Sequence, residues 1–151
     1  MLFRSERERL PGWRNGLAAY YIDEELAIRL VDQPKGAREP RHTHPGVHGT
    51  TIVEGRAIID GVTLRPCDAL LGPSNEPHGP LEYPDGCKLL SCFQGGFDHS
   101  EAHAPSDEKL YRLIQSAQLA WEPGDAHGTQ AKTLLADLVA AMRPMRRSAV
   151  W

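Results

Sequence analysis

The sequence predicts an all-β fold, either a sandwich or a barrel, followed by two C-terminal helices. From Gly16 to about Gly95 the chain consists of short runs of β-forming residues, separated by glycine, proline, asparagine or aspartate. The 14 glycines and 12 prolines lie mostly between these runs, where they form turns and leave the strands intact. With 151 residues, the chain has the usual size of one domain with one continuous core.

Six runs in this region are predicted to be strands, because each combines β-forming residues with turn residues at its ends. They are Leu17–Ile22, Leu26–Asp32, Thr50–Glu54, Arg56–Asp60, Ala69–Gly72 and Lys88–Gln94. The dipeptide Asp60-Gly61 predicts a tight hairpin turn, since both positions tolerate positive φ.

Beyond Ser106 the apolar residues recur at the spacing of helices. Two such stretches occur, at Leu110, Leu113, Ile114 and Ala117 and at Leu134, Leu135, Leu138, Val139 and Met142. We therefore expect three parts: a charged N-terminal segment (residues 1–15), a barrel (residues 16–104) and a C-terminal helical extension (residues 105–151).

Charge and hydropathy disfavour several classes of partner. Seventeen lysines and arginines face 20 aspartates and glutamates, for a net charge of -3, so there is no positive field to attract nucleic acid or an anionic membrane. No apolar run approaches the ~18 residues of a membrane span, and the first residues lack the apolar stretch of a secretory signal. The three cysteines show no CxxC spacing, which argues against a disulfide framework or a thiolate zinc site. We expect a cytoplasmic protein with neither a nucleic acid nor a membrane as partner.

Four of the seven histidines are concentrated in one stretch, as His42, His44, His48 and His78. Alternate side chains of an extended segment face the same side, so His42 and His44 project together. His48 can return towards them across the Pro45-Gly46 turn. Neutral imidazole is a common protein ligand of zinc, iron, copper and nickel. The sequence thus predicts one divalent metal ion, held by these four side chains.

The same stretch resembles the cupin superfamily, in particular its small, single-domain, bacterial-type metal-binding members. The first cupin motif is a glycine, five residues, His-x-His, three or four residues, a glutamate, six residues and a glycine. Every spacing is kept here by Gly36, His42-Thr43-His44, His48 and Gly55. The one departure is His48, where the family usually has glutamate. The resemblance implies a double-stranded β-helix, which is a jelly-roll-like barrel.

The second cupin motif is less well preserved. Pro73 and His78 match it. The family has Gly, Gly and Asn where this chain has Cys67, Asn75 and Glu82. Cys67-Asp68 resembles the Gly-Asp turn that opens a later strand of the family, so a structural role is expected for Cys67.

Histidine in place of the usual glutamate has an electrostatic consequence. No anionic protein ligand then offsets the +2 charge of the ion, so the site favours an anionic ligand such as an enolate, a carboxylate or a catecholate. All-histidine cupins of this type resemble Fe(II) dioxygenases that act on small enolisable compounds. This resemblance implies Fe(II) as the cofactor, with zinc, manganese, nickel or copper as alternatives. Thr50 and Ile52 share the inward face with His48 by strand alternation and are the predicted substrate contacts.

Two other functions stay open, because one fold supports several reactions. One is a redox-inactive zinc, manganese or nickel cupin that acts as an isomerase or lyase on a sugar or polar acid. The other is a non-catalytic module that binds a small ligand. The sequence assigns no catalytic acid or base. We also expect a homodimer, since small cupins often pair the edges of their barrels.

Overall fold

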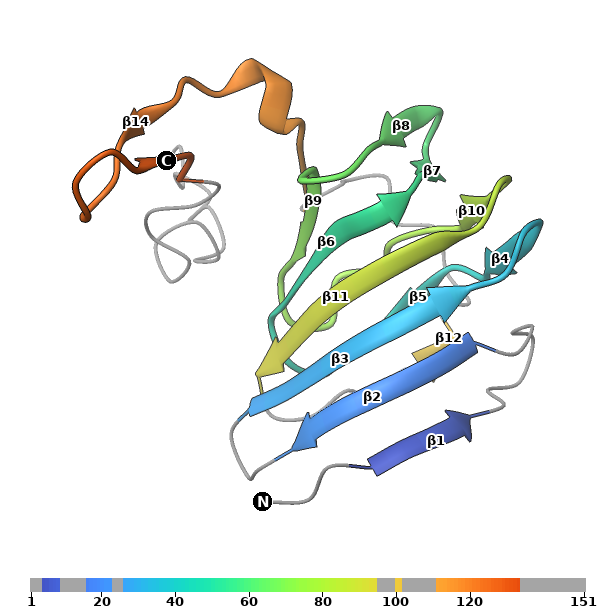
Figure 1. Cartoon of the computed structure of the whole chain (residues 1–151). Coiled ribbons are helices and arrows are strands. Elements are labelled where there is room, and N and C mark those ends of the chain that lie inside the picture. Colours follow the sequence, from blue (N-terminus) through green and yellow to red (C-terminus); the bar gives the residue numbers. More distant parts are fainter. Residues whose placement is uncertain (1–3, 9–15, 23–25, 95–99, 102–110, 134–151) are drawn as a thin grey trace, which may run out of the picture.

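The computed structural model describes residues 4–8, 16–22, 26–94, 100–101 and 111–133 (Figure 1). Seven strands form the larger sheet, in which every pair of neighbours is antiparallel. Their spatial order is β1 (Arg4–Glu8), β2 (Gly16–Ile22), β3 (Leu26–Gln33), β11 (Cys87–Gln94), β6 (His48–Gly55), β9 (Ala69–Gly72) and β13 (Arg112–Ile114).

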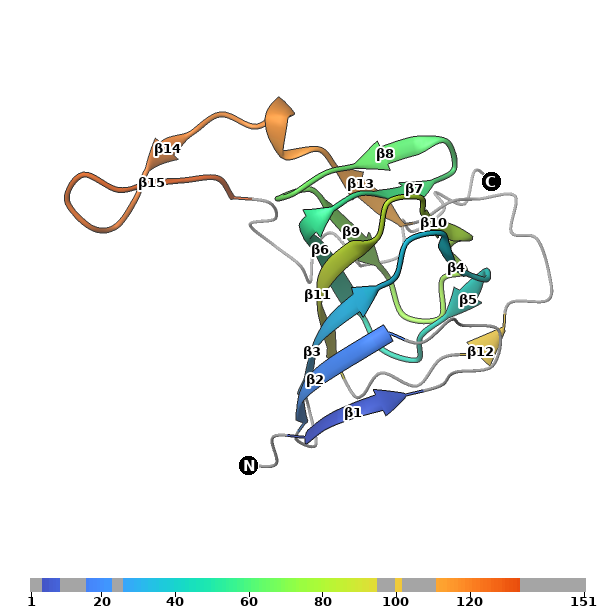
Figure 2. The same cartoon turned by 45° about the vertical axis from the view of Figure 1, so that its right-hand side comes forward.

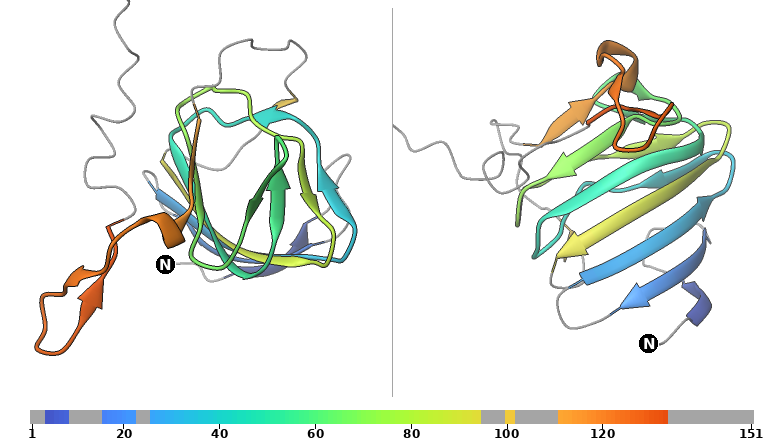
Figure 3. Two further views of the ribbon diagram at one scale, coloured as in Figure 1. Left: turned by 90° about the horizontal axis from the view of Figure 1, so that it is seen from above. Right: turned by 60° about the vertical axis from the view of Figure 1, so that its left-hand side comes forward.

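A four-stranded sheet lies opposite the larger one (Figure 2). Its order is β4 (Ala37–Glu39), β10 (Leu81–Tyr83), β7 (Ala57–Ile59) and β8 (Val62–Leu64). Two short pairs complete the described strands, β5 (His42–Thr43) with β12 (Ser100–Glu101) and β14 (Glu122–Pro123) with β15 (Gln130–Ala131). Seen from above, the strands of the two sheets surround a common interior, and the β14–β15 pair extends away from them (Figure 3).

The interior is filled by the inward side chains of both sheets. Burial alternates along β3 and β11, so every second residue of these strands faces the core. Each large apolar side chain removed from water stabilises the fold by about 1.5–3 kcal/mol. The core cluster includes Val31, Ile52, Ile59, Leu64, Leu70 and Leu89.

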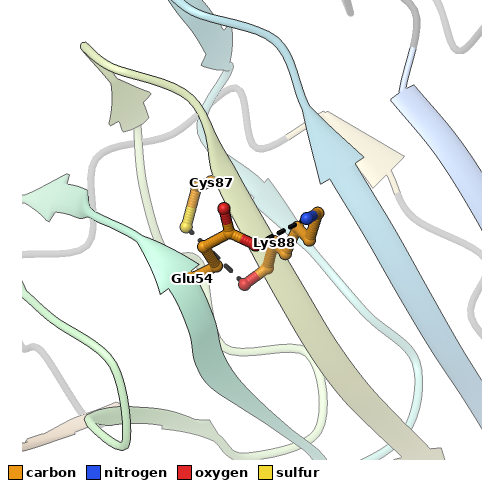
Figure 4. A network of polar contacts seen from close by, with 3 residues as sticks. All are labelled: Glu54, Cys87 and Lys88. Atoms are coloured by element: carbon orange, nitrogen blue, oxygen red, sulfur yellow. Dashed lines mark hydrogen bonds and ion pairs between the residues drawn. The ribbon is translucent and has the colours of Figure 1, made fainter.

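The outer face of the larger sheet carries cross-strand polar pairs. Lys88 in β11 lies opposite Glu54 in β6, and the two side chains form an ion pair with an Nζ–Oε2 distance of 2.5 Å (Figure 4). The neighbouring Cys87 thiol makes a long contact of 3.8 Å with the carbonyl oxygen of Lys88. Because both charged side chains are largely exposed, the pair contributes little to stability.

The predicted all-β barrel is confirmed, and all six predicted strands are present to within about two residues at each end. The hairpin predicted at Asp60-Gly61 joins β7 to β8, with φ of 50° at Asp60 and 76° at Gly61. No helix in the described part of the chain is long and apolar enough to cross a membrane.

The helix predicted around Leu110–Ala117 is wrong. This stretch forms β13 on the edge of the larger sheet and then a single 3-10 turn over Ser116–Gln118. Tyr111 is buried in the core and Leu113 packs against it, which is the two-residue period of a strand, and a stretch this short fits either period. The second predicted helix, at Leu134–Met142, lies outside the described residues.

The described residues 4–8 of the charged N-terminal segment also belong to the barrel sheet, because β1 pairs with β2 along its whole length. On the C-terminal side, the buried carboxylate of Asp68 anchors the chain after β13. It accepts hydrogen bonds from the backbone N–H of Arg65 (2.8 Å) and of Ser116 (2.7 Å). The described beginning of the predicted extension is therefore fixed to the barrel.

Candidate metal centre

Main-chain hydrogen bonds bring the predicted ligands together. His42 and His78 exchange two of them, each 3.0 Å long, as an isolated antiparallel bridge. The backbone N–H of Asn75 donates to the carbonyl of His44 (2.7 Å). His48 begins β6 and lies opposite Gly72 of β9. Segments far apart in the sequence are thereby held side by side without any contribution from the imidazoles.

The four imidazoles form one buried cluster. Ring centroids are 4.9 Å apart for His42–His44, 4.4 Å for His42–His78, 4.6 Å for His44–His48 and 4.6 Å for His48–His78. Each of these residues is at most 6% exposed. In His42, His44 and His78, the candidate ligand atoms all lie within 4.8 Å of one another, so these three residues could hold a metal ion. His48 belongs to the ring cluster but not to this set of three.

Hydrogen bonds fix which nitrogen of two rings carries the proton. Nδ1 of His42 lies 2.8 Å from the carbonyl oxygen of Pro40, and Nδ1 of His78 lies 3.1 Å from that of Glu76. A carbonyl only accepts, so both Nδ1 atoms are donors, and in the neutral rings Nε2 retains its lone pair. Such a bond from the second ring nitrogen is typical of metal-binding histidines, because it orients the ring.

The ring of His48 is enclosed by its neighbours. Its ring stacks on Phe93, with centroids 5.6 Å apart and an interplanar angle of 18°. Among the described residues, neither ring nitrogen has a partner of normal hydrogen-bond geometry, although both are buried. A buried polar group left unpaired costs about 1–3 kcal/mol. A cation in the cluster would supply the missing partner, so this ring fits the predicted metal.

Burial favours the neutral form of two of the imidazoles. Burial, and after it the nearby rings of His78, His44 and His42, lower the pKa of His48 to about 2, against the opposing effect of a backbone hydrogen bond at Gly46. Burial also lowers the pKa of His78 to about 4, opposed by its bond to the Glu76 carbonyl. Neutral rings are the form that binds metal, so no proton has to leave these two side chains at neutral pH.

The imidazoles line an interior cavity of about 30 Å³. Thr50 is among the other lining residues, and its hydroxyl lies 2.8 Å from that of Ser91, across the β6–β11 pair. Ile52, the other predicted substrate contact, is packed in the hydrophobic core and does not line this cavity. Side chains that sequence reasoning did not select also line it, among them Arg29, Glu39, Tyr83, Ser91 and Phe93.

One of these additional residues, Arg29, could have been recognised from the sequence. Arg29 occupies an inward position of β3 between Ala27 and Val31, and a charged residue on the apolar face of a predicted strand is unusual. Glu39 carried no such signal, since β4 was not predicted.

At two positions where this chain departs from the second cupin motif, the backbone still has the conformation that glycine favours. Cys67 has φ of 73° and Asn75 has φ of 59°, so both adopt the left-handed conformation at positions where the motif has glycine. Asn75 also holds His44 by its backbone N–H. The degenerate motif therefore still makes the turns that place the ligands.

Comparisons with known proteins agree with this geometry. No protein-family model and no curated protein matches the sequence. Among solved structures, an RmlC-like cupin from Shewanella frigidimarina NCIMB 400 superposes with a TM-score of 0.53 and 25% identity, over 63% of this chain and 87% of that one. This chain has the cupin fold.

Two further solved structures show the same fold at lower identity. A candidate dioxygenase from Nostoc punctiforme has a TM-score of 0.65 and 15% identity, over 82% of this chain and 47% of that one. A candidate acetylacetone dioxygenase from Methylibium petroleiphilum has a TM-score of 0.52 and 14% identity, over 60% of this chain and 70% of that one. The chain thus spans about half the length of the Nostoc protein.

Proposed function

We propose that this cupin is a metal-dependent enzyme in which His42, His44 and His78 bind one divalent cation and His48 supplies a fourth imidazole. The observation that carries the proposal is the set of three buried histidines whose candidate ligand atoms lie within 4.8 Å of one another. The fixed Nδ1–H donors of two of them support it, as do the unpartnered nitrogens of His48.

We further propose that the cation is Fe(II) and the reaction is the oxygenation of a small enolisable or carboxylate substrate. When bound, Fe(II) supplies Lewis acidity and redox chemistry with oxygen. The protein contributes an electrostatic preference for anionic ligands. The four imidazoles bring no negative charge to offset that of the cation, and the cavity is also lined by Arg29 and Glu39, so an anionic group bound directly to the ion is favoured.

Thr50 is the proposed substrate contact of β6. Its hydroxyl lines the cavity beside that of Ser91, and paired hydroxyls can donate to or accept from a polar ligand. The small volume of the cavity, about 30 Å³, supports a small substrate.

The experiment that tests this function combines metal content and oxygen uptake. Protein purified without added metal is analysed for bound ions and then assayed with an oxygen electrode against diketones and catechols. Iron with oxygen uptake supports the proposal. Tightly bound zinc, manganese or nickel without uptake favours an isomerase or lyase, and a metal site without turnover favours a ligand-binding module.

Matched histidine variants identify the ligands. We expect His42→Ala and His78→Ala to lose stoichiometric metal, whereas His127→Ala, at an exposed position, retains it. Metal at 100 times its Kd stabilises the folded state by about 2.7 kcal/mol, so the two ligand variants also lose the rise in Tm on metal addition. Full metal retention by both would contradict the assignment.

We also propose that the protein is a homodimer. Leu30 of β3 and Leu90 of β11 are paired on the outer face of the larger sheet, and each is about two-fifths exposed. Pairing of this face with a second copy would remove both side chains from water. Analytical ultracentrifugation of the wild type and of Leu90→Lys tests this, with a dimer expected only for the wild type.

A further inference from the structure

The cavity that the four imidazoles line also contains a buried carboxylate. Glu39, at the end of β4, is only 6% exposed, and it lines the same cavity as the four imidazoles. Gln33 of β3 donates a 2.5 Å hydrogen bond from Nε2 to its Oε1. This bond joins the smaller sheet to the larger one and fixes where the carboxylate sits.

The Tyr83 hydroxyl lies beside this carboxylate. Tyr83 is fully buried in β10 and lines the same cavity. Its hydroxyl is within hydrogen-bonding range of Glu39, and this contact shifts the pKa of both groups. The contact lacks normal hydrogen-bond geometry, so the hydroxyl can turn towards a ligand in the cavity.

We propose that Glu39 is the catalytic base of this site and removes a proton from a carbon next to a substrate carbonyl, while the Tyr83 hydroxyl donates a hydrogen bond to the substrate. The substrate class is then a small 1,3-dicarbonyl compound or 2-oxo acid. This inference rests on the proposed function, since the carbonyl is to be held by the cation.

The step balances within the residues named. The C–H bond breaks, its electron pair stays on the substrate as the enolate, and the proton forms an O–H bond with the Glu39 carboxylate. Glu39 becomes a neutral acid that still accepts the hydrogen bond from Gln33. The tyrosine proton is not transferred, because burial and the nearby Glu39 hold the pKa of Tyr83 above its ordinary value.

The surroundings of Glu39 suit a base that works near neutral pH. Burial raises its pKa from 4.5 to about 7, against the lowering effects of Tyr83, Gln33 and the positive charge of Arg29. Arg29 and Gln33 face it from β3, Tyr83 from β10 and the Cys87 thiol from β11. A base is most effective when its pKa lies near the working pH.

The test measures proton removal without oxygen. Metal-loaded protein is incubated under argon in D2O with 2,4-pentanedione or pyruvate, and deuterium uptake next to the carbonyl is followed by NMR against protein-free controls. We expect Glu39→Gln to lower the protein-dependent exchange at least 100-fold and Glu39→Asp to restore part of it. Glu82→Gln, the same substitution at an exposed glutamate of β10, leaves it unchanged. Metal content is measured for every variant.

A second readout needs no metal. In the metal-free protein, infrared spectra taken across the neutral pH range show a carboxylic-acid band that titrates in the wild type and in Glu82→Gln and is lost in Glu39→Gln. Loss of the band in Glu39→Gln, together with its retention in Glu82→Gln, identifies Glu39 as the buried acid.

The outcomes separate the two proposals. Undiminished exchange in a metal-loaded Glu39→Gln variant overturns the role of Glu39 and leaves the proposed function standing. A wild-type protein that binds metal but exchanges neither probe also overturns the role of Glu39, and oxygen uptake then decides the function independently. A wild type without bound metal and without oxygen uptake overturns both.

Discussion

The ring of His48 lies directly against Gly72. A Cβ atom built on Gly72 would be 2.0 Å from Cε1 of His48 and 2.7 Å from its Nε2, and real Cβ atoms do not approach other atoms so closely. The ring cannot move away easily, because Phe93 and the rings of His44 and His78 surround it. The absence of a side chain at position 72 thus sets the place of the fourth imidazole.

Gly72→Ala is expected to displace His48, weaken metal binding and destabilise the metal-free protein by about 1–3 kcal/mol through overpacking. Isothermal titration with the metal and urea unfolding measure the two effects. Gly49→Ala is the matched control, because a Cβ there meets only the end of the Leu71 side chain, at 3.2 Å. Equal metal affinity in both variants would show that the position of His48 does not matter for binding.

Substitution of His48 tests whether the charge of this side chain controls the binding of anionic ligands independently of metal binding. We expect His48→Glu to retain the metal while weakening the binding of anionic chelators such as catechols, because the carboxylate offsets part of the charge of the ion. The neutral His48→Gln is the control that lacks this charge. Competition titrations with one anionic and one neutral chelator measure the difference, and parallel losses for both chelators in His48→Glu would refute the electrostatic explanation.

Glu39→Gln is expected to change stability in a pH-dependent way. The pKa of Glu39 is raised in the folded state, so the wild type loses stability as the pH rises from the unfolded value of 4.5 through about 7. That difference corresponds to about 3 kcal/mol. The variant, which carries no ionisable group there, should therefore be more stable than the wild type at pH 8 and similar at pH 4.5. Urea unfolding at both pH values tests this, and an equal effect at both would contradict it.

Thr50→Val removes one hydroxyl of a buried pair and keeps the shape of the side chain. Because the Ser91 hydroxyl then loses its partner, we expect a loss of stability of about 1–3 kcal/mol and a raised KM with unchanged metal content. Thr51→Val, the neighbour on the less buried face of β6, is the control. An unchanged KM would remove Thr50 from the substrate contacts.

The sequence was sufficient for the barrel and for the cluster of histidines. The strands with strong alternation and clear turn residues were predicted, as was the turn at Asp60-Gly61. Short elements were missed: β4 and β10 contain three residues each, too few for a period to show. Their pairing depends on contacts between distant segments, and β4 and β10 bring Glu39 and Tyr83 to the cavity.

The edge strand β13 shows a second limit of sequence reasoning. Tyr111 and Leu113 are compatible with either a helix or a strand when read alone, and the unpaired edge of β9 decides between them. Arg29 shows the opposite case, since its inward position follows from the predicted strand Leu26–Asp32. The functional role of Arg29 can be inferred only from the cavity that it lines.

The paired backbone bonds between His42 and His78 set the spacing of the two imidazoles through the polypeptide itself. If the proposed cation binds there, different divalent ions compete for one geometry. The intrinsic preference of imidazole, together with the supply of each ion, then decides which one occupies it.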